Sequence, residues 1–196
     1  HLEQRDVQLT GQELLVEVAQ EAQHELLGPV PEVGRQPVKE DVDGSQHLGQ
    51  DLLERHDVAG ILDVGCGPGQ FAQYLRKHSE IPYLGVDFST TAIADAQRRA
   101  VPNTRFEVLD VTTDPLPTIP DDWAIVCTEV LEHIVDDLAL VRAFPAAALC
   151  VCSVPNFFTF SHLRWFDDEV DVAARYAPHF QGLDIVKLPL AGGPNA

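Results

Sequence analysis

The chain has 196 residues, enough for one domain with a sizeable core but short for a second one. Thirteen basic side chains oppose 31 acidic ones, and the formal net charge of −18 repels the phosphate backbone on which nucleic-acid affinity depends. No apolar run approaches the roughly 18 residues that a membrane span requires. A nucleic-acid partner is therefore disfavoured, and a membrane span is not expected.

The N-terminal quarter predicts a helix followed by a linker. Apolar residues recur at helical spacing within residues 12–27, at Leu14, Leu15, Val18, Ala22 and Leu26. Prolines and glycines then punctuate residues 28–45, which predicts a loop. We therefore expect residues 1–48 to form an N-terminal helix and linker, acting as a lid or as a packing element, and residues 49–196 to form the main domain.

Location and redox state are also expectations from the sequence. The first residues, HLEQ, lack a basic stretch ahead of an apolar one, so no secretory signal is expected and a cytoplasmic location follows by default. Of the four cysteines, Cys66 lies in a glycine-rich stretch, while Cys127, Cys150 and Cys152 lie in apolar runs. None has the spacing of a zinc finger, so we expect buried, reduced thiols.

From residue 49 onward, short apolar runs alternate with helical patterns. Strands are predicted at Gly60–Val64, Tyr83–Val86, Phe106–Leu109, Trp123–Thr128, Ala147–Val154 and Leu183–Leu188. Helices are predicted near 50–57, 69–78, 89–100 and 136–143. This alternation predicts an α/β fold, a three-layer sandwich with a doubly wound, mostly parallel sheet and a site at the carboxyl ends of the strands. Because the last predicted strand comes so late, we expect the sheet to lack its last edge strand.

The strongest motif is ILDVGCGPGQ at residues 61–70, an apolar strand that runs into a glycine turn and then a helix. Glycines allow a sharp turn and a close backbone approach to a ligand, and the helix start offers free N–H groups to an anionic group. A dinucleotide-binding loop requires Gly-x-Gly-x-x-Gly, but Gln70 stands where the third glycine would be. The motif therefore favours a nucleotide-type cofactor other than NAD.

This motif resembles the first motif of class I S-adenosylmethionine-dependent methyltransferases, and the likeness extends from about Gly60 to Asn156. The resemblance implies a Rossmann-like fold with S-adenosyl-L-methionine as cofactor. It implies that Asp63 holds the amino group of the cofactor, directly or through water. It also implies that Gly65, Gly67 and Gly69 let the backbone lie against the methionine and ribose portions.

Two further acidic residues at strand ends extend the resemblance. Asp87 matches the carboxylate that accepts hydrogen bonds from the ribose hydroxyls, and Asp110 matches the acidic position near the adenine, with backbone contact from Val111. Cys66, Phe88 and Glu129 complete the expected cofactor-binding set. Each residue alone is weak evidence for the resemblance, but the order of these residues along the chain is specific to the family pattern.

The segment TEVLEHI at residues 128–134 holds the candidates for metal binding or proton transfer. Glu129, Glu132 and His133 stand at i, i+3 and i+4, which on a helical turn brings them to one face. With His162 they could ligate a divalent ion such as Mg²⁺, Mn²⁺ or Zn²⁺. This set resembles the metal sites of small-RNA 2′-O-methyltransferases and of ubiquinone-biosynthesis O-methyltransferases. Metal-free bases and ordinary structural histidines remain open alternatives.

The loop after Asn156 carries the candidates for acceptor binding. Its aromatic residues could line an apolar pocket for a small aromatic or lipid-like acceptor, or could fold onto the core: Phe157, Phe158, Phe160, Trp165 and Phe166. Arg164 is a nearby cation that could hold a substrate carboxylate or phosphate.

Taken together, the sequence predicts methyl transfer to a small-molecule acceptor, at oxygen. Such in-line transfer requires positioning and removal of a proton, for which His133 and His162 are the catalytic candidates. A metal-dependent RNA 2′-O-methyltransferase is one alternative, and the acidic charge weighs against it. A cofactor-binding, non-catalytic subunit is the other.

Overall fold

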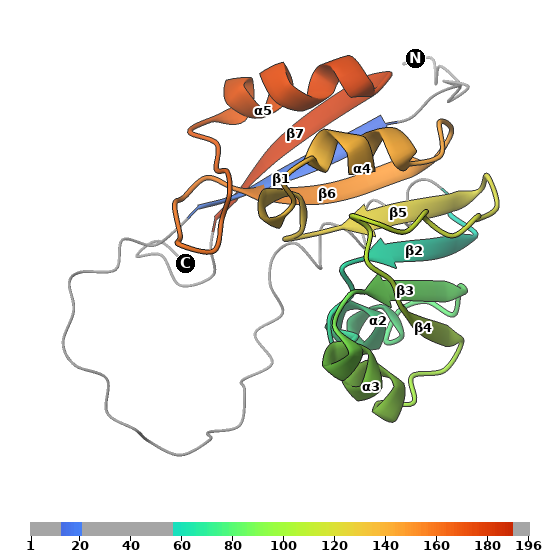
Figure 1. Ribbon diagram of the computed structural model, residues 1–196. Coiled ribbons are helices and arrows are strands. Elements are labelled where there is room, and N and C mark those ends of the chain that lie inside the picture. The colour runs from blue at the N-terminus through green and yellow to red at the C-terminus, as the bar shows by residue number, and fades with distance from the viewer. Residues whose placement is uncertain (1–12, 21–56, 190–196) are drawn as a thin grey trace, which may run out of the picture.

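The computed structural model describes residues 13–20 and 57–189, which form a twisted sheet with helices on both faces (Figure 1). The strands are β1 Glu13–Gln20, β2 Gly60–Val64, β3 Tyr83–Asp87, β4 Thr104–Val108, β5 Trp123–Cys127, β6 Leu149–Pro155 and β7 Gly182–Pro189. The α-helices are α2 Gln70–Leu75, α3 Thr90–Arg98, α4 Asp137–Ala143 and α5 Glu169–Tyr176. Two short 3₁₀ turns are η1 Leu131–His133 and η2 Ala177–His179.

The sheet has the strand order β4-β3-β2-β5-β6-β1-β7, and every pairing is parallel. From β2 the chain winds outward through β3 and β4, then returns to the other side of β2 with β5 and continues to β6. The winding direction thus reverses between β2 and β5. In open parallel sheets, ligands bind outside the carboxyl ends of the strands at such a reversal.

Alternate residues of the strands feed two separate cores, one on each face of the sheet. Leu62 and Val64 point to the face where α4 and α5 pack, the latter through Val172 and Tyr176. Ile61 points to the opposite face, which α2 and α3 cover. Both faces are covered, as a parallel sheet requires. The predicted three-layer, doubly wound, Rossmann-like architecture is confirmed.

The N-terminal segment differs from the prediction, because Glu13–Gln20 form a strand instead of part of a helix at 12–27. This strand, β1, pairs on both sides, with Glu13 opposite Leu149 of β6 and opposite Gly182 of β7. Pairing with two neighbours outweighs the local helical pattern, since strand propensity depends strongly on such context. The rest of that predicted helix, the linker at 28–45 and residues 50–56 lie outside the described residues.

β1 also corrects the expectation that the sheet lacks a strand. It lies between β6 and β7, so the sheet reaches seven strands with β7 at its edge. A division after residue 48 therefore does not separate the N-terminal segment from the sheet. Within residues 13–20 and 57–189, no helix has the length and apolar character needed to cross a membrane.

The other predicted strands and helices from residue 60 onward are confirmed, with their ends shifted by a few residues. Helix α5 is an element that the sequence analysis missed. Asp168 caps it by accepting hydrogen bonds from the backbone N–H groups of Val170 and Asp171, at 2.9 and 3.0 Å. Val172 and Tyr176, one turn apart, are buried. The acidic cap and this spacing are the signals that could have identified it.

Candidate active site

The glycine turn between β2 and α2 adopts left-handed backbone conformations. Gly65, Gly67 and Gly69 have φ angles of 78°, 51° and 78°. A Cβ at Gly65 would lie 2.2 Å from Cγ2 of Val130, whereas a Cβ at Gly67 would meet no heavy atom within 4 Å. Gly65 is thus required by packing as well as by conformation, and Gly67 faces open space where a ligand can approach.

Asp87, at the end of β3, ties this turn to the next helix. Its Oδ2 accepts a hydrogen bond from the backbone N–H of Gly67 at 3.0 Å, and its Oδ1 accepts one from Ser89 at 2.8 Å. Ser89 in turn caps α3, because its Oγ accepts the backbone N–H of Ala92 at 3.2 Å. A carboxylate has about four acceptor sites, so Asp87 keeps acceptor capacity for a ligand.

A cavity of about 550 Å³ opens at the carboxyl ends of β2, β3, β4 and β5, at the topological reversal. Six of the predicted cofactor-binding residues line it: Gly65, Asp87, Phe88, Asp110, Val111 and Glu129. The sequence analysis missed five of its lining residues, which follow from the fold alone: Val86, Leu109, Thr112, Val130 and Ile134. Phe88 is 76% exposed, which suits it to packing against a flat ring at the cavity wall.

Asp63 and Cys66 lie in the core instead of at the cavity wall. Asp63 is 3% exposed and accepts a hydrogen bond from the hydroxyl of Tyr83 on the neighbouring strand. Burial raises the pKa of Asp63 to about 7, the Tyr83 hydroxyl opposes this rise, and the charge of Asp87 adds to it. Burial likewise raises the pKa of the Cys66 thiol. Neither side chain lines the cavity.

Asp110 follows β4 and is held by a local turn. Its Oδ1 accepts hydrogen bonds from the backbone N–H of Thr112 at 2.9 Å and from the Thr112 hydroxyl at 2.6 Å. These bonds hold the pKa of Asp110 below its usual value. The negative charge at the cavity rim is thereby stabilised.

Glu129 follows β5 in a left-handed conformation, with a φ of 56°. Ser153 of β6 holds it at both ends: the Ser153 hydroxyl accepts the backbone N–H of Glu129 and donates to its Oε1, each at 2.8 Å. The 3₁₀ turn η1 begins only at Leu131. The predicted helical turn therefore does not include Glu129, and the carboxylate is bound to Ser153.

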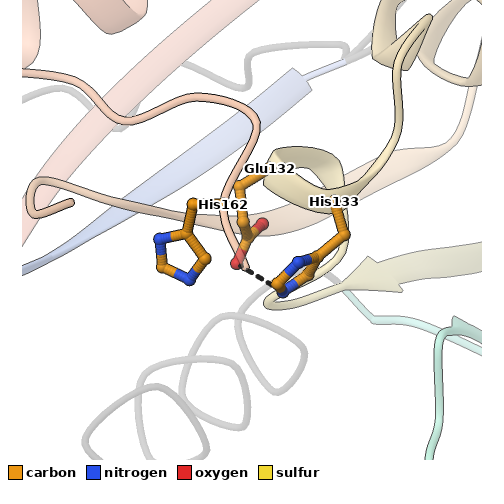
Figure 2. Close-up of side chains that lie close together, drawn as sticks. All are labelled: Glu132, His133 and His162. Atoms are coloured by element: carbon orange, nitrogen blue, oxygen red, sulfur yellow. Dashed lines mark ion pairs between the residues drawn. The ribbon is translucent and has the colours of Figure 1, made fainter. Parts of the chain in front are cut away.

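Three of the four predicted metal ligands do come together (Figure 2). One ligand atom from each of Glu132, His133 and His162 lies within 4.8 Å of the others, and Glu129 is not in this group. Nε2 of His133 lies 3.7 Å from Oε1 of Glu132, and the two imidazole centroids are 5.1 Å apart. His133 lines the cofactor cavity. The site thus joins two segments that are distant in sequence.

Hydrogen bonds to backbone carbonyls indicate which nitrogen of each imidazole carries the proton. Nδ1 of His133 donates to the carbonyl of Ser161 at 2.9 Å, and Nδ1 of His162 donates to that of Phe157 at 3.4 Å. A carbonyl only accepts, so in the neutral rings the proton sits on Nδ1 and leaves Nε2 with a free lone pair. In this tautomer, Nε2 of each ring can bind a metal ion or accept a proton.

Glu132 carries a buried carboxylate that accepts no hydrogen bond within the described part of the chain. The residue is fully buried, and neither carboxylate oxygen has a hydrogen-bond partner among the described residues. Burial, followed by the charge of Glu129, raises the pKa of this carboxyl to about 8, although the charge of Arg164 partly opposes the rise. Buried polar atoms are nearly always paired, so this exception suggests a missing partner.

The loop after β6 departs from the predicted acceptor pocket. Phe166 is buried in the core, and Phe157 packs against His162 with ring centroids 5.5 Å apart. Phe158 packs against Phe160 and Trp165 on the surface. None of these aromatics lines the cofactor cavity or the adjoining cavity of about 500 Å³ along α4. Of the two alternatives, the burial of Phe166 agrees with a loop folded onto the core, and none of the five aromatics lines either of these cavities.

Arg164 also differs from the prediction, since its guanidinium is turned inward. It donates to the backbone carbonyls of Leu131, Ile134 and Val135, and its side chain is 16% exposed. A guanidinium occupied by three carbonyls has little capacity left for a substrate anion.

Comparison with known proteins agrees with this geometry. Residues 61–151 match a family model described as a methyltransferase domain. Phosphoethanolamine N-methyltransferase of Triticum aestivum is 33% identical over 97 residues, which cover 48% of this chain and 19% of that protein. Ubiquinone biosynthesis O-methyltransferase of Neisseria meningitidis is 31% identical over 101 residues, which cover 47% of this chain and 42% of that protein. Trans-aconitate 2-methyltransferase of Variovorax paradoxus is 33% identical over 105 residues, which cover 50% of this chain and 39% of that protein.

The chain spans less than half the length of these three relatives. The matched region nevertheless contains the glycine turn, Asp87 and the strand ends that surround the cavity. With the doubly wound parallel sheet, this match over residues 61–151 supports a class I, Rossmann-like S-adenosylmethionine-dependent methyltransferase.

Proposed function

We propose that this chain transfers a methyl group from S-adenosylmethionine to an oxygen of a small-molecule acceptor. The observation that carries the proposal is the 550 Å³ cavity at the reversal of the sheet, with the carboxylate of Asp87 bonded to the glycine turn at its wall. The three relatives above are named for small-molecule methyl transfer, one of them at nitrogen and one at oxygen. The choice of oxygen rests on the cluster of Glu132, His133 and His162.

The residues present fit the cofactor. Open space beside Gly67 admits a ligand against the backbone, and Asp87 keeps acceptor capacity for ribose hydroxyls. Phe88 and Val111, which both line the cavity, suit packing against a flat heteroaromatic ring. In this proposal Asp63 acts from the core, by fixing the end of β2, or through a water that bridges it to the cofactor amino group.

The chemistry asks for positioning and for removal of one proton. The sulfonium supplies the methyl group and a good leaving group, so no covalent enzyme intermediate is needed. Nε2 of His133, with its free lone pair at the cavity, can accept the proton of the acceptor hydroxyl as that oxygen bonds to the methyl carbon. His162, beside it, can share this role.

This proposal is tested by titrating the protein with S-adenosylhomocysteine in a calorimeter. We expect binding by the wild type and at least about tenfold weaker binding by Asp87→Asn, since hydrogen bonds to a charged acceptor are worth about 1.5–3 kcal/mol. Asp95→Asn on α3, an exposed residue that pairs with Arg98 on its own helix, is the matched control and should bind as the wild type does. A folded wild type that binds NAD in preference to S-adenosylhomocysteine would overturn the proposal.

A metal-assisted form of the reaction is a second candidate, favoured by the buried carboxylate of Glu132, whose oxygens accept no hydrogen bond from the described residues. Glu132 and the Nε2 atoms of His133 and His162 are the residues that would hold a divalent ion, and their oxygen and nitrogen donors suit Mn²⁺ or Zn²⁺. When bound, such an ion acts as a Lewis acid toward acceptor hydroxyls. The three side chains then serve to hold and orient it.

Metal titration of chelator-treated protein checks this second candidate. We expect the wild type to bind Mn²⁺ or Zn²⁺ in the presence of S-adenosylhomocysteine, and Glu132→Gln to bind at least about tenfold more weakly, because it loses an anionic ligand. Glu80→Gln, at an exposed glutamate that pairs with Arg76, serves as the control. If the wild type binds S-adenosylhomocysteine but neither ion, His133 is left as a metal-free base.

Two rival functions make different predictions. An RNA 2′-O-methyltransferase needs a surface that attracts phosphates, and the net charge of −18 opposes this. A non-catalytic subunit would bind the cofactor through the same cavity but transfer no methyl group to any acceptor.

A further inference from the structure

The proposed catalytic cluster is assembled from two segments that the sheet alone does not hold together. Glu132 and His133 lie on η1 after β5, whereas His162 lies on the loop after β6 (Figure 2). Two single hydrogen bonds link the segments directly: the backbone N–H of Leu163 donates to the Glu132 carbonyl at 2.8 Å, and His133 donates to the Ser161 carbonyl. Each such bond contributes only about 1 kcal/mol net.

Arg164 supplies a stronger connection. From the loop that carries His162, its guanidinium donates to the Leu131 carbonyl, to the Ile134 carbonyl at 2.6 Å and to the Val135 carbonyl at 3.0 Å. These carbonyls flank Glu132 and His133 on both sides. Hydrogen bonds from a charged donor are roughly twice as strong as neutral ones, and the rigid fork of guanidinium donors fixes their directions.

Asp137 anchors this guanidinium from the other side. It is fully buried at the first position of α4, and its Oδ1 lies 3.4 Å from Nη2 of Arg164. From α5, Arg175 donates to it through Nε at 2.9 Å, and the Tyr176 hydroxyl donates at 2.7 Å. Arg164 therefore joins η1, the start of α4 and the His162 loop, while Asp137 keeps two other partners if Arg164 is changed.

We propose that Arg164 is a positioning residue that holds His162 against Glu132 and His133 through three backbone carbonyls of residues 131–135. This inference rests on the proposed function for the meaning of the cluster, but its geometry can be tested without activity. Without Arg164, the loop after β6 keeps its aromatic contacts but loses its fixed distance from η1.

The test measures the contact between the two imidazoles by nuclear magnetic resonance on the full chain, in chelator-treated samples so that no metal bridges the rings. Because the ring centroids lie 5.1 Å apart, the wild type should show a nuclear Overhauser effect between ring protons of His133 and His162. We expect Arg164→Gln to lose this cross-peak while thermal unfolding remains cooperative. A cross-peak of wild-type intensity in Arg164→Gln would overturn the proposal, as would its absence from the wild type.

Two further variants separate positioning from general damage. Arg76→Gln is the matched control, because Arg76 is also a largely buried arginine that donates to two backbone carbonyls, those of Ser79 and Ile81, after α2. It should keep the cross-peak. If Arg164→Gln does not fold, Arg164→Lys preserves the charge but lacks the fork of donors, and the same loss is expected. Failure of the wild type to bind S-adenosylhomocysteine would refute the proposed function and leave this measurement decisive on its own.

Discussion

The glycines of the turn after β2 serve different purposes, although their backbone angles are similar. At Gly65 a side chain would collide with Val130, which also lines the cavity. At Gly67 a side chain would enter open space beside the backbone N–H that Asp87 holds. The left-handed backbone favours glycine at both positions, but packing adds a requirement at Gly65, whereas room for a ligand adds one at Gly67.

Alanine at each position separates these roles. Gly67→Ala should cost about 1–2 kcal/mol of unfolding free energy, the strain of a left-handed residue with a side chain. Gly65→Ala should cost at least about 3 kcal/mol, because the collision with Val130 adds to the same strain. Chemical denaturation measures both, and titration with S-adenosylhomocysteine should show weakened binding by the stable Gly67→Ala. Equal costs for the two variants would contradict the assignment.

Asp63 gives the protein a pH-dependent stability of known sign. Its folded pKa is raised to about 7, whereas an exposed aspartate in the unfolded chain titrates near its ordinary value of 3.8. As pH rises between these values, the unfolded state loses the proton first, and this favours unfolding. The stabilising contribution of Asp63 to the unfolding free energy is therefore fully present below about pH 3.8 and is lost as pH rises toward 7.

Asp63→Asn should remove this dependence. Relative to the wild type, the variant should gain about 2 kcal/mol or more in unfolding free energy between about pH 4.5 and pH 7, because an amide does not ionise. Subtracting the wild-type profile of unfolding free energy from that of the variant removes the pH dependence that both proteins share through repulsion among their acidic groups. Asp121→Asn, at an exposed position, is the control and should follow the wild-type profile. Parallel profiles for Asp63→Asn would show that the carboxyl is ionised in the folded protein.

At the scale of elements, α4 and α5 pack on one face of the sheet and are joined by an ion pair between the buried Asp137 and the partly exposed Arg175. Burial alone would raise the pKa of Asp137, but hydrogen bonds from Arg175 and Tyr176 and the charge of Arg164 hold it below its usual value. The adjacent Asp136 is exposed: it caps α4 by accepting the backbone N–H of Ala139 at 3.0 Å, and it lies 3.7 Å from the exposed guanidinium of Arg142.

These neighbouring aspartates provide a matched pair of variants. Asp137→Asn should lower the unfolding free energy by about 3–5 kcal/mol, because Arg175 and Arg164 then lose the buried charge that compensates them. Asp136→Asn should be nearly neutral, since asparagine caps helices about as well as aspartate. Thermal and denaturant unfolding of the two variants measures this difference in unfolding free energy. Similar stabilities of the two variants would contradict a structural role for the Asp137 network.

Elements were predictable from the sequence where the local pattern and the pairing agree. The strands through Ile61, Val126 and Val151 are short and apolar, and their alternation with helices predicts a parallel, doubly wound sheet. Glu13–Gln20 escaped prediction because their apolar spacing fits either period and only the neighbours β6 and β7 select the strand. Glu129 was misplaced because its left-handed conformation precedes the turn.

For the whole molecule, the position of the site followed from the fold class. A doubly wound sheet brings Asp87 and Asp110 to one edge, so the cofactor cavity could be predicted from strand ends. The pairing of His162 with Glu132 could be guessed only by resemblance, since it depends on how the loop after β6 returns over η1. The guanidinium of Arg164 was misread for the same reason: its three carbonyl partners are more than two dozen residues away in sequence.

The placement of β1 bears on the order in which the molecule can fold. β1 and β7 are neighbours, with Glu13 opposite Gly182, although all the other strands of the sheet lie between them in the sequence. Contacts between such distant residues carry a large loop-closure cost and slow folding. The strands β2 to β6 can pair without them. We therefore expect the cofactor cavity to form before β1 and β7 complete the far side of the sheet.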